Sequence, residues 1–299
     1  MVNVLVAGAT GMLGSRIAHH LLDEPGVAQG GKLGLLVRDG SLDDPAKKAG
    51  IDDLVAQGAV VVPGDLQDDG ALAEATSGVA VVVSAVQGGD SVVTDGQVRL
   101  ARAAERSRVR RFIPSDFAID IFAADPGAPM FAARRRADEI IDTLDLEVLH
   151  VLTGGFLDKM VSPTGGIVDH GNQTVTCWGA GSEPSNMTTV EDTARLTARL
   201  ALDDTAPAGV RTFAATEATP EQIAEEISRA TGRTYTVKSR GTLDELREAI
   251  SNEHDPTAAI GLWYQLVVAT TPTFTALENG RYPDIRLTTL QEQVRQSFQ

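Results

Sequence analysis

Glycines that follow an apolar opening segment form the first candidate site. Residues 4–7 are apolar, and Gly8, Gly11 and Gly14 come directly after them. Glycine permits a sharp turn, a close approach of backbone to ligand, and tight packing of a helix on a strand. A helix that begins here offers free N–H groups and a positive dipole end. The spacing predicts a turn that binds the pyrophosphate of a dinucleotide; a tight turn without a ligand is the alternative.

A basic residue ends the second apolar run, where the adenosine ribose of a bound dinucleotide is expected. Arg38 follows residues 33–37, and Asp39 follows Arg38. A guanidinium suits the 2′-phosphate of NADP, whereas NAD sites usually place an acid at this point. The acidic Asp39 next to Arg38 weakens this distinction between NADP and NAD. The alternative interpretation of Arg38 is a solvated loop charge. On balance the sequence predicts NADP(H) as the cofactor.

Alternating apolar and amphipathic segments must position these residues. Short apolar runs are typical of strands buried on both faces, and their alternation with helices predicts crossover connections and a parallel sheet. The predicted strands are residues 4–7, 33–37, 59–62, 79–83, 112–113 and 148–152, and the predicted helices include 13–22, 97–107 and 131–144.

The second half of the chain has a different pattern. Capping boxes begin at Thr219, with Gln222 three residues later, and at Thr242, with Glu245 three residues later. Each predicts the start of a helix. The fold class is therefore α/β, a doubly wound parallel sheet with a second, smaller mixed α/β domain. We expect the first domain to span residues 1–157 with a returning segment near 188–204, and the second to comprise 158–187 and 205–299.

Composition limits the partners and the compartment. The 299 residues carry a formal net charge of -15, which argues against nucleic-acid binding. No apolar run is long enough to cross a membrane, and the chain opens on a predicted strand without a basic leader, so a cytoplasmic location is expected by default. The single cysteine, Cys177, cannot form a disulfide within the chain, and the five histidines show no metal-ligand spacing, so no metal is expected.

Several short segments resemble, in order and spacing, the NmrA-like and isoflavone-reductase-like branch of the atypical short-chain dehydrogenases. They are residues 6–14 (VAGATGMLG), 36–38, 64–66, 111–117 (RFIPSDF), 153–157, 190–194 and 281–285. The resemblance implies an NADP-binding Rossmann domain and a smaller substrate-binding domain. It also implies NADPH-dependent reduction of a small aromatic, phenylpropanoid-like or quinone-like substrate, by a monomer or homodimer.

The resemblance also assigns residues to the cofactor site. It places the glycine turn on the pyrophosphate, Arg38 and Lys47 at the 2′-phosphate, Leu66 near the adenine, and the segments at residues 84–87 and 114–115 along the nicotinamide. Phe156 falls where the family packs an aromatic ring against cofactor or substrate. The predicted cofactor-binding residues are Gly8, Thr10, Gly11, Met12, Leu13, Gly14, Arg38, Lys47, Leu66, Ala85, Val86, Pro114 and Phe156.

The chain departs from this family at the catalytic position. The reductases carry a lysine on the helix after the Pro-Ser-acid-Phe motif, and the matching residue here is Arg134, with Met130 where ordinary short-chain dehydrogenases have tyrosine. An arginine stays protonated, so it can bind a ribose or stabilise an oxyanion but cannot act as a base. We predict Arg134 and Ser115 as the catalytic residues; a structural ion pair is the alternative role of Arg134.

Helical spacing predicts which side chains of this segment point inward. Residues 130, 134, 137, 141 and 144 share one stripe, so Arg134 is expected to face the protein. Arg135, Asp138, Glu139 and Asp142 lie mostly off that stripe. His150, in an apolar run, is predicted to be a hydrogen-bonded core residue.

Two functions remain open from the sequence. The first, which we predict, is an NADPH-dependent oxidoreductase that transfers a hydride to a small-molecule substrate, and the resemblance of the substrate-domain sequence to the reductases favours it. The second is a catalytically weak NADP(H)-sensing regulator that acts through a protein partner, and the absence of the tyrosine and lysine favours it.

Overall fold

A computed structural model describes residues 3–162 and 166–298 of the chain. The Cα trace divides into two compact units. Unit 1 contains the chain up to Asp116, together with Ala133–Val151 and Thr193–Arg211, and unit 2 contains Phe117–Ala132, Leu152–Asp192 and the chain from Thr212 onward. The segment 117–132, which the expected boundaries put in the first domain, belongs to unit 2 in this division, because Ile121 and Phe131 pack in an apolar cluster with Val267.

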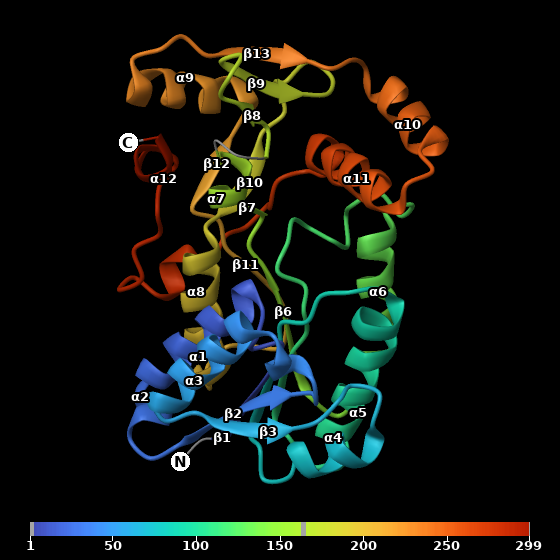
Figure 1. The fold of residues 1–299 in the computed structure, drawn as a ribbon, viewed down its shortest axis with the longest axis vertical. Helices are drawn as coiled ribbons and strands as arrows, with labels where there is room; N and C mark the ends of the chain where they lie inside the picture. Colours follow the sequence, from blue (N-terminus) through green and yellow to red (C-terminus); the bar gives the residue numbers. More distant parts are fainter. Residues whose placement is uncertain (1–2, 163–165, 299) are drawn as a thin grey trace. The chain divides into compact units, whose positions relative to one another are not determined.

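Unit 1 is built on a seven-stranded sheet with the order β11-β6-β5-β4-β1-β2-β3 (Figure 1). Its strands are β1 (Asn3–Ala7), β2 (Lys32–Val37), β3 (Val60–Pro63), β4 (Val81–Ser84), β5 (Arg111–Ile113), β6 (Glu147–Leu152) and β11 (Gly209–Thr212). The neighbouring pairs from β6 to β3 are parallel. The chain reverses its direction of winding between β1 and β4, where the polypeptide crosses from one half of the sheet to the other. The predicted doubly wound sheet is confirmed.

Helices cover both faces of this sheet, with α1, α2 and α3 on one side and α4, α5 and α6 on the other (Figure 1). The helices of unit 1 are α1 (Met12–Asp23), α2 (Pro25–Ala28), α3 (Pro45–Ala56), α4 (Asp69–Ala75), α5 (Gln97–Arg106), most of α6 (Pro129–Ile141) and most of α8 (Val190–Leu202), with a short 3-10 turn, η1 (Ser41–Asp43), and a π-helical turn, η2 (Ser91–Gly96). Because apolar strands are sandwiched between these layers, each strand buries both faces.

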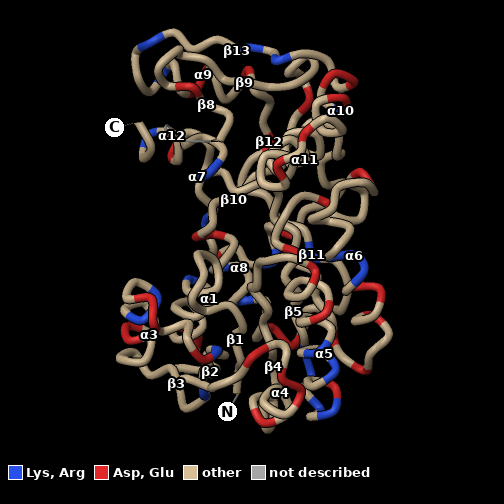
Figure 2. Tube along the Cα trace, turned by 45° about the vertical axis from the view of Figure 1, so that its right-hand side comes forward, with Lys and Arg blue, Asp and Glu red and all other residues tan. Residues whose placement is uncertain are grey.

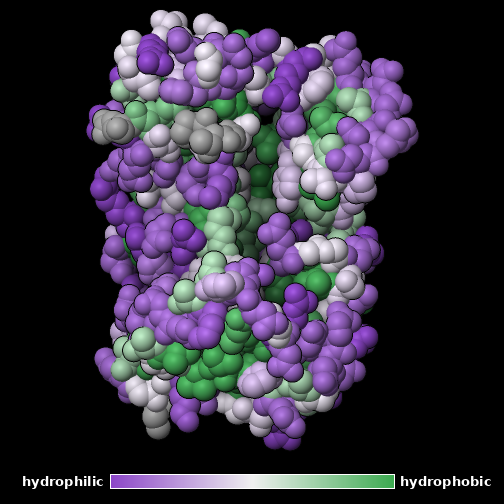
Figure 3. Space-filling model, in the orientation of Figure 1, coloured by the Kyte–Doolittle hydropathy of each residue, from purple (hydrophilic) through white to green (hydrophobic). Residues whose placement is uncertain are grey.

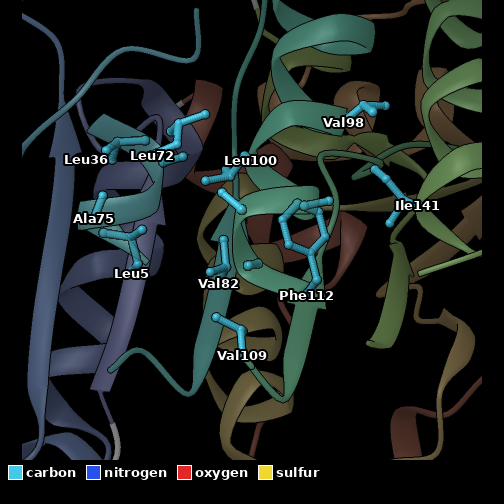
Figure 4. Packing of buried hydrophobic residues seen from close by; sticks show 14 of the residues in the cluster. Leu5, Leu36, Leu72, Ala75, Val82, Val98, Leu100, Val109, Phe112 and Ile141 are labelled. Carbon is cyan, nitrogen blue, oxygen red and sulfur yellow. The ribbon is translucent and has the colours of Figure 1, made fainter. Parts of the chain in front are cut away.

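The core between the sheet and helices α4 to α6 shows why these segments fold here. Leu5, Val82 and Phe112 from three strands meet Leu100 of α5 and Ile141 of α6, and all five are fully buried (Figure 4). Burying side chains of this size contributes about 1.5–3 kcal/mol each. This packing fixes the ends of β4, β5 and α6, which carry the candidate site.

Unit 2 contains two small three-stranded sheets, with the orders β12-β10-β7 and β13-β9-β8. Its strands are β7 (Gly155–Phe156), β8 (Val168–Asp169), β9 (Thr174–Cys177), β10 (Ser185–Thr188), β12 (Thr216–Ala218) and β13 (Thr236–Ser239). Its helical segments are α7 (Leu157–Met160), α9 (Pro220–Thr231), α10 (Leu243–Asn252), α11 (Pro256–Thr270), η3 (Asn279–Arg281) and α12 (Leu290–Phe298). Each sheet has one parallel and one antiparallel pair, so the expected mixed architecture is confirmed.

The two predicted capping boxes are present at the starts of α9 and α10. Thr219 accepts a hydrogen bond from the backbone N–H of Gln222, and the Gln222 side chain accepts one from the backbone N–H of Thr219. Thr242 and Glu245 form the same reciprocal pair. These local signals are readable from sequence because both partners lie within one turn.

The surface is predominantly charged and polar. Figure 2 shows acidic and basic residues interspersed along the trace of both units. A hydrophobic patch lies low in Figure 3 over β2 and β3, and Val60 on the edge strand β3 is 53% exposed. The described helices include none with the length and apolarity that a membrane-spanning segment requires.

Candidate functional site

The glycine turn between β1 and α1 has no room for larger residues. Gly8 has φ +86°, and a Cβ there would lie 2.4 Å from the carbonyl oxygen of Ala85, at the end of β4. A Cβ on Gly14 would lie 2.2 Å from the carbonyl oxygen of Gly8. Contacts this short are excluded sterically, so both positions require glycine. The backbone of the turn is therefore held directly against β4 and the first turn of α1.

The N-terminus of α1 keeps the properties of an anion site. Gly11 is the N-cap residue, no side chain caps the helix, and its first turn contains no acidic residue. The backbone N–H groups of the first turn and the positive dipole end are thus not neutralised by an acid from α1. Met12 and Leu13 begin the helix, and Met12 is 42% exposed. This geometry fits a phosphate-binding turn.

Arg38 and Lys47, the predicted contacts of a 2′-phosphate, lie on the surface of unit 1. Arg38 is exposed directly after β2, and its side chain makes no hydrogen bond or ion pair with the described residues. Lys47, on α3, is 47% exposed, and its Nζ is 3.8 Å from Oδ2 of Asp44, the N-cap of that helix. Arg38 is therefore available to an anionic ligand, and Lys47 is only loosely held.

The ends of β4 and β5 are joined by a buried serine. The hydroxyl of Ser115 donates to the carbonyl oxygen of Val86 at 2.8 Å, and the backbone N–H of Ser115 donates to Oε1 of Gln97 at 2.6 Å. Pro114 precedes it and is also buried, while Ala85 is half-buried beside the glycine turn. The contacts link the turn at Gly8 to Ser115 through the end of β4.

Gln97 is a residue that the sequence analysis did not single out. It is fully buried at the start of α5, directly after the π-helical turn η2, and its Nε2 donates to the carbonyl oxygen of Val93. Such turns are common at functional sites because they redirect side chains from a helix. Within unit 1, the hydroxyl of Thr94 in this turn also donates to the carbonyl oxygen of Ala133 on α6. A π-helical turn has no distinctive short sequence pattern, so no sequence signal marked Gln97.

Arg134 faces the same site, as the helical spacing predicts. It is half-buried on α6, and its Nε donates to the carbonyl oxygen of Ser115 at 2.8 Å. The two predicted catalytic residues are thus in direct contact, through the side chain of Arg134 and the backbone of Ser115. This bond orients the guanidinium at the carboxyl end of β5.

The remaining predicted site residues lie in different environments. Leu66, after β3, is half-buried and packs close to Gly96, where a Cβ would lie 3.0 Å from the Cβ of Leu66. Phe156 lies in unit 2, half-buried on β7, and pairs with Thr188 of β10. Met130 packs against the apolar cluster of unit 2 that contains Phe131. Thr10, in the glycine turn, is half-buried.

A buried polar cluster lies beside Ser115 and Arg134. Nδ1 of His150, on β6, is 2.8 Å from Oδ2 of Asp116, and its Nε2 is 3.0 Å from Oδ1 of Asp142. Asp138 of α6 lies 3.9 Å from the same Nδ1. Burial lowers the pKa of His150, but its hydrogen bond to Asp116 and the surrounding carboxylates outweigh burial and raise that pKa to about 9. Burial and the nearby Asp116 raise the pKa of Asp138 to about 8.

The position of Asp138 corrects the expectation from helical spacing. Asp138 was expected off the inward stripe with Asp142, but it is 1% exposed, as buried as its neighbour Ala137. The expected stripe followed the apolar residues of α6. The buried face of the helix also includes the polar Asp138, which faces His150. The prediction that His150 is a hydrogen-bonded core residue is confirmed, since it is 3% exposed with both ring nitrogens bonded.

Solved structures with the same fold are known. The chain matches a structure of AtPrR2 with NADP+ and (+)pinoresinol at a TM-score of 0.83 and 20% identity, covering 99% of this chain and 98% of that one. A binary complex of leucoanthocyanidin reductase with NADPH from Vitis vinifera matches at a TM-score of 0.81 and 20% identity, over 99% of both chains. At this identity the likeness shows the fold.

Sequence relatives agree with the structural comparison. Isoflavone reductase homolog P3 of Arabidopsis thaliana is 29% identical over 208 residues, which are 67% of this chain and 64% of that protein. The alignment thus spans less than two thirds of that relative's length. The model of the NmrA-like family matches residues 2–256. The chain therefore belongs to the NmrA-like family.

Proposed function

We propose that this chain is an NADPH-dependent reductase that transfers a hydride to a small aromatic, phenylpropanoid-like or quinone-like substrate. One observation carries the proposal. An unbroken series of contacts runs from Gly8 to Ala85 and Val86, then to Ser115 and Arg134. The glycine turn and a hydrogen-bonded arginine thus lie at one edge of one parallel sheet, where ligands of such sheets bind, and this supports the proposal.

The residues present fit NADP(H). Gly8 and Gly14 leave a turn without side chains, the start of α1 is free of acids, and Arg38 is an exposed, unpaired cation among the described residues. When bound, NADPH supplies the hydride. AtPrR2 and leucoanthocyanidin reductase, which share this fold, were solved with NADP+ and NADPH respectively, which supports the assignment.

The chain's own residues would position the substrate and stabilise charge. Arg134 is fixed by the Ser115 carbonyl and stays protonated, so it would stabilise negative charge that develops on a substrate oxygen as a hydride arrives on carbon. The hydroxyl of Ser115 bonds the Val86 carbonyl and is held at the same edge, where it would orient a substrate or ribose hydroxyl. Neither group is a base at neutral pH.

The test is NADPH consumption with a panel of quinones and phenylpropanoids. We expect Arg134→Ala to lower turnover by about a hundredfold, because a fixed cation at a developing oxyanion is lost. Cofactor affinity should fall less, since the adenosine-side contacts remain. Arg134→Lys should keep or raise turnover. Unchanged turnover in Arg134→Ala with lowered thermal stability would assign Arg134 a structural role instead.

The cofactor assignment has its own test. Arg38→Ala should weaken NADP(H) binding by about tenfold to a hundredfold, because a charge-assisted hydrogen bond to the 2′-phosphate is lost. Binding of NAD(H), which lacks that phosphate, should barely change. Isothermal titration with both nucleotides measures the difference. An equal loss for the two nucleotides would show that Arg38 does not contact the phosphate.

A second candidate is an NADP(H)-sensing regulator that acts through a protein partner. The observation that favours it is Met130, which packs among apolar side chains where ordinary short-chain dehydrogenases place a tyrosine. A protein without that acid would bind the nucleotide and turn over slowly. Tight NADP(H) binding with no NADPH consumption across the panel would support this function over the reductase.

A further inference from the structure

His150 lies between three carboxylates in unit 1, and the proposed reaction does not use it directly. Its Nδ1 faces Asp116 at 2.8 Å and Asp138 at 3.9 Å, and its Nε2 faces Asp142 at 3.0 Å. The side chains of His150, Asp116 and Asp138 are at most 3% exposed, whereas that of Asp142 is 52% exposed. The interior part of the cluster therefore holds two carboxylates and one imidazole.

The arrangement determines the protonation of the imidazole. Both ring nitrogens of His150 face carboxylate oxygens, which accept hydrogen bonds and donate none when ionised. Both nitrogens therefore donate, and the ring is an imidazolium. Asp116, Asp138 and His150 each place a ligand atom within 4.8 Å of the others, a spacing that a metal ion can also use. An imidazolium has no free lone pair for a metal, so His150 itself is the cation of this cluster.

The two buried carboxylates depend on that cation. Among the described residues, neither oxygen of Asp138 has a hydrogen-bond partner, and neither does Oδ1 of Asp116. Above its pKa of about 8, Asp138 also becomes charged, and like charges in a low-dielectric interior then repel strongly. A neutral residue at position 150 would leave Asp116 and Asp138 facing each other with no positive group between them.

Each of these two carboxyl groups lies close in the sequence to one candidate catalytic residue. Asp116 directly follows Ser115, and Asp138 lies one helical turn after Arg134 on α6. The bond from Nε of Arg134 to the Ser115 carbonyl closes a ring of contacts that passes through His150. Arg134 and Asp138 belong to one helix, and Ser115 and Asp116 to one segment, so the Arg134–Ser115 bond and the carboxyl cluster join the same two parts of unit 1.

We propose that His150 is a positioning residue, which holds Arg134 against Ser115 by supplying the positive charge that Asp116 and Asp138 share. The proposal rests on the proposed reductase function for its effect on turnover. The electrostatic coupling between His150 and Asp138, on which the positioning depends, can be measured without any substrate.

The charges around His150 define its pH range. Asp116 faces it from the segment after β5, Asp138 and Asp142 face it from α6 and the turn that follows, and Arg134 acts on Asp138 from the same helix. These carboxylates raise the pKa of His150 to about 9 despite its burial. The imidazolium therefore persists through neutral pH, and positioning should weaken only in alkaline solution.

A double-mutant cycle tests the proposal in the full-length protein. The variants are His150→Gln, Asp138→Asn and the double variant, with Thr76→Val as a control for the loss of a buried hydrogen bond. Thr76 is fully buried in unit 1 and bonds the Ala103 carbonyl, on α5. Each variant is measured at pH 8.5, where Asp138 is largely ionised and His150 still carries its charge, and at a temperature where all are folded. The quantities are NADPH affinity, the fluorescence emission of bound NADPH, kcat and KM.

We expect His150→Gln to lower kcat by about tenfold to a hundredfold, because a misplaced catalytic group costs this much. Its NADPH affinity should change less than about threefold, since the glycine turn and Arg38 are untouched, while the emission of bound NADPH shifts. Adding Asp138→Asn should restore most of kcat and the wild-type emission, because one buried carboxylate has become neutral. The control should lower the melting temperature only.

Three results would overturn the proposal. One is a double variant no better than His150→Gln. Another is a fall in kcat in Thr76→Val equal to that in His150→Gln. The third is stoichiometric zinc or manganese in the purified wild type that Asp138→Asn abolishes. If His150→Gln does not fold, the wild type is compared with Asp138→Asn across pH: NADPH emission and kcat of the wild type should change near pH 9, and an identical profile in Asp138→Asn contradicts the proposal.

Failure of the reductase function gives a different result. In that case no substrate of the panel consumes NADPH in any variant. The emission of bound NADPH and the coupling of stabilities in the cycle still report whether His150 and Asp138 act together.

Discussion

The two ends of β5 carry buried charge in opposite ways. At the amino end, the fully buried Arg111 donates from Nη1 to the carbonyl oxygens of Leu200, Ala201 and Asp203 at the end of α8, and from Nη2 to Glu147. Just past the carboxyl end, Asp116 and Asp138 share a single imidazolium, and three of their four carboxyl oxygens have no hydrogen-bond partner within the described residues.

This difference separates a charge with a structural role from the charges at the candidate site. The Arg111 guanidinium meets the negative end of a helix dipole and a carboxylate, so its charge is compensated and it ties α8 to the sheet. The cluster at the other end sets two buried carboxyl groups against a single imidazolium, and the pKa values of His150 and Asp138 are both strongly raised. Uncompensated groups of this kind are typical of functional sites, where strongly shifted pKa values gather. Both sites are buried, so burial alone does not distinguish them.

The largest expected effect is at the structural end. Arg111→Met should lower the free energy of unfolding by about 3–5 kcal/mol, because it leaves three helix-end carbonyls without their donor and removes one of the two guanidinium groups that bond Glu147. Urea denaturation at neutral pH measures this loss. The emission of bound NADPH should stay unchanged, because Arg111 contacts none of the candidate site residues in unit 1 that the structure describes. A stable Arg111→Met variant would remove the contrast between the two ends.

A pH-dependent effect is expected at the candidate site. The pKa of His150 is raised to about 9 from an ordinary value of 6.5, so its stabilising contribution is complete below pH 6.5 and is lost as pH rises to about 9. The pKa of Asp138 is raised to about 8 from 3.8, so its contribution is likewise lost between those values. Both groups act in the same direction. We therefore expect the free energy of unfolding to fall as pH rises from 6.5 to 9.

Asp138→Asn serves as the matched variant for this pH dependence. An amide does not ionise, so the variant should be more stable than the wild type at pH 8, by about 1 kcal/mol, and its pH profile should be flatter. Urea denaturation at several pH values measures both. A less stable Asp138→Asn protein with an unchanged profile would show that the Asp138 carboxyl is compensated after all, as Arg111 is.

Much of the fold was predictable from the sequence because its signals are local. Apolar runs marked the strands of the parallel sheet, and the capping boxes at Thr219 and Thr242 marked the starts of α9 and α10. The glycines at positions 8 and 14 were predicted from spacing, and their lack of space for a Cβ agrees with that. Helical spacing also predicted that Arg134 faces inward, where it bonds the Ser115 carbonyl. The roles of these residues toward a cofactor remain predictions.

The buried charges were decided by tertiary structure. Asp116 and His150 are 34 positions apart, and Gln97 and Ser115 are 18 apart, so no local pattern brings either pair together. The periodicity of apolar residues in α6 put Asp138 outside the buried stripe. Asp138 is nevertheless buried, because the residue that it faces, His150, comes from the separate strand β6. Whether a segment forms a helix or a strand depends mostly on residues within a few positions, because backbone geometry and capping act over short distances along the chain. The free energy of a buried charge depends on every group around it, and those groups meet only when the sheet has formed.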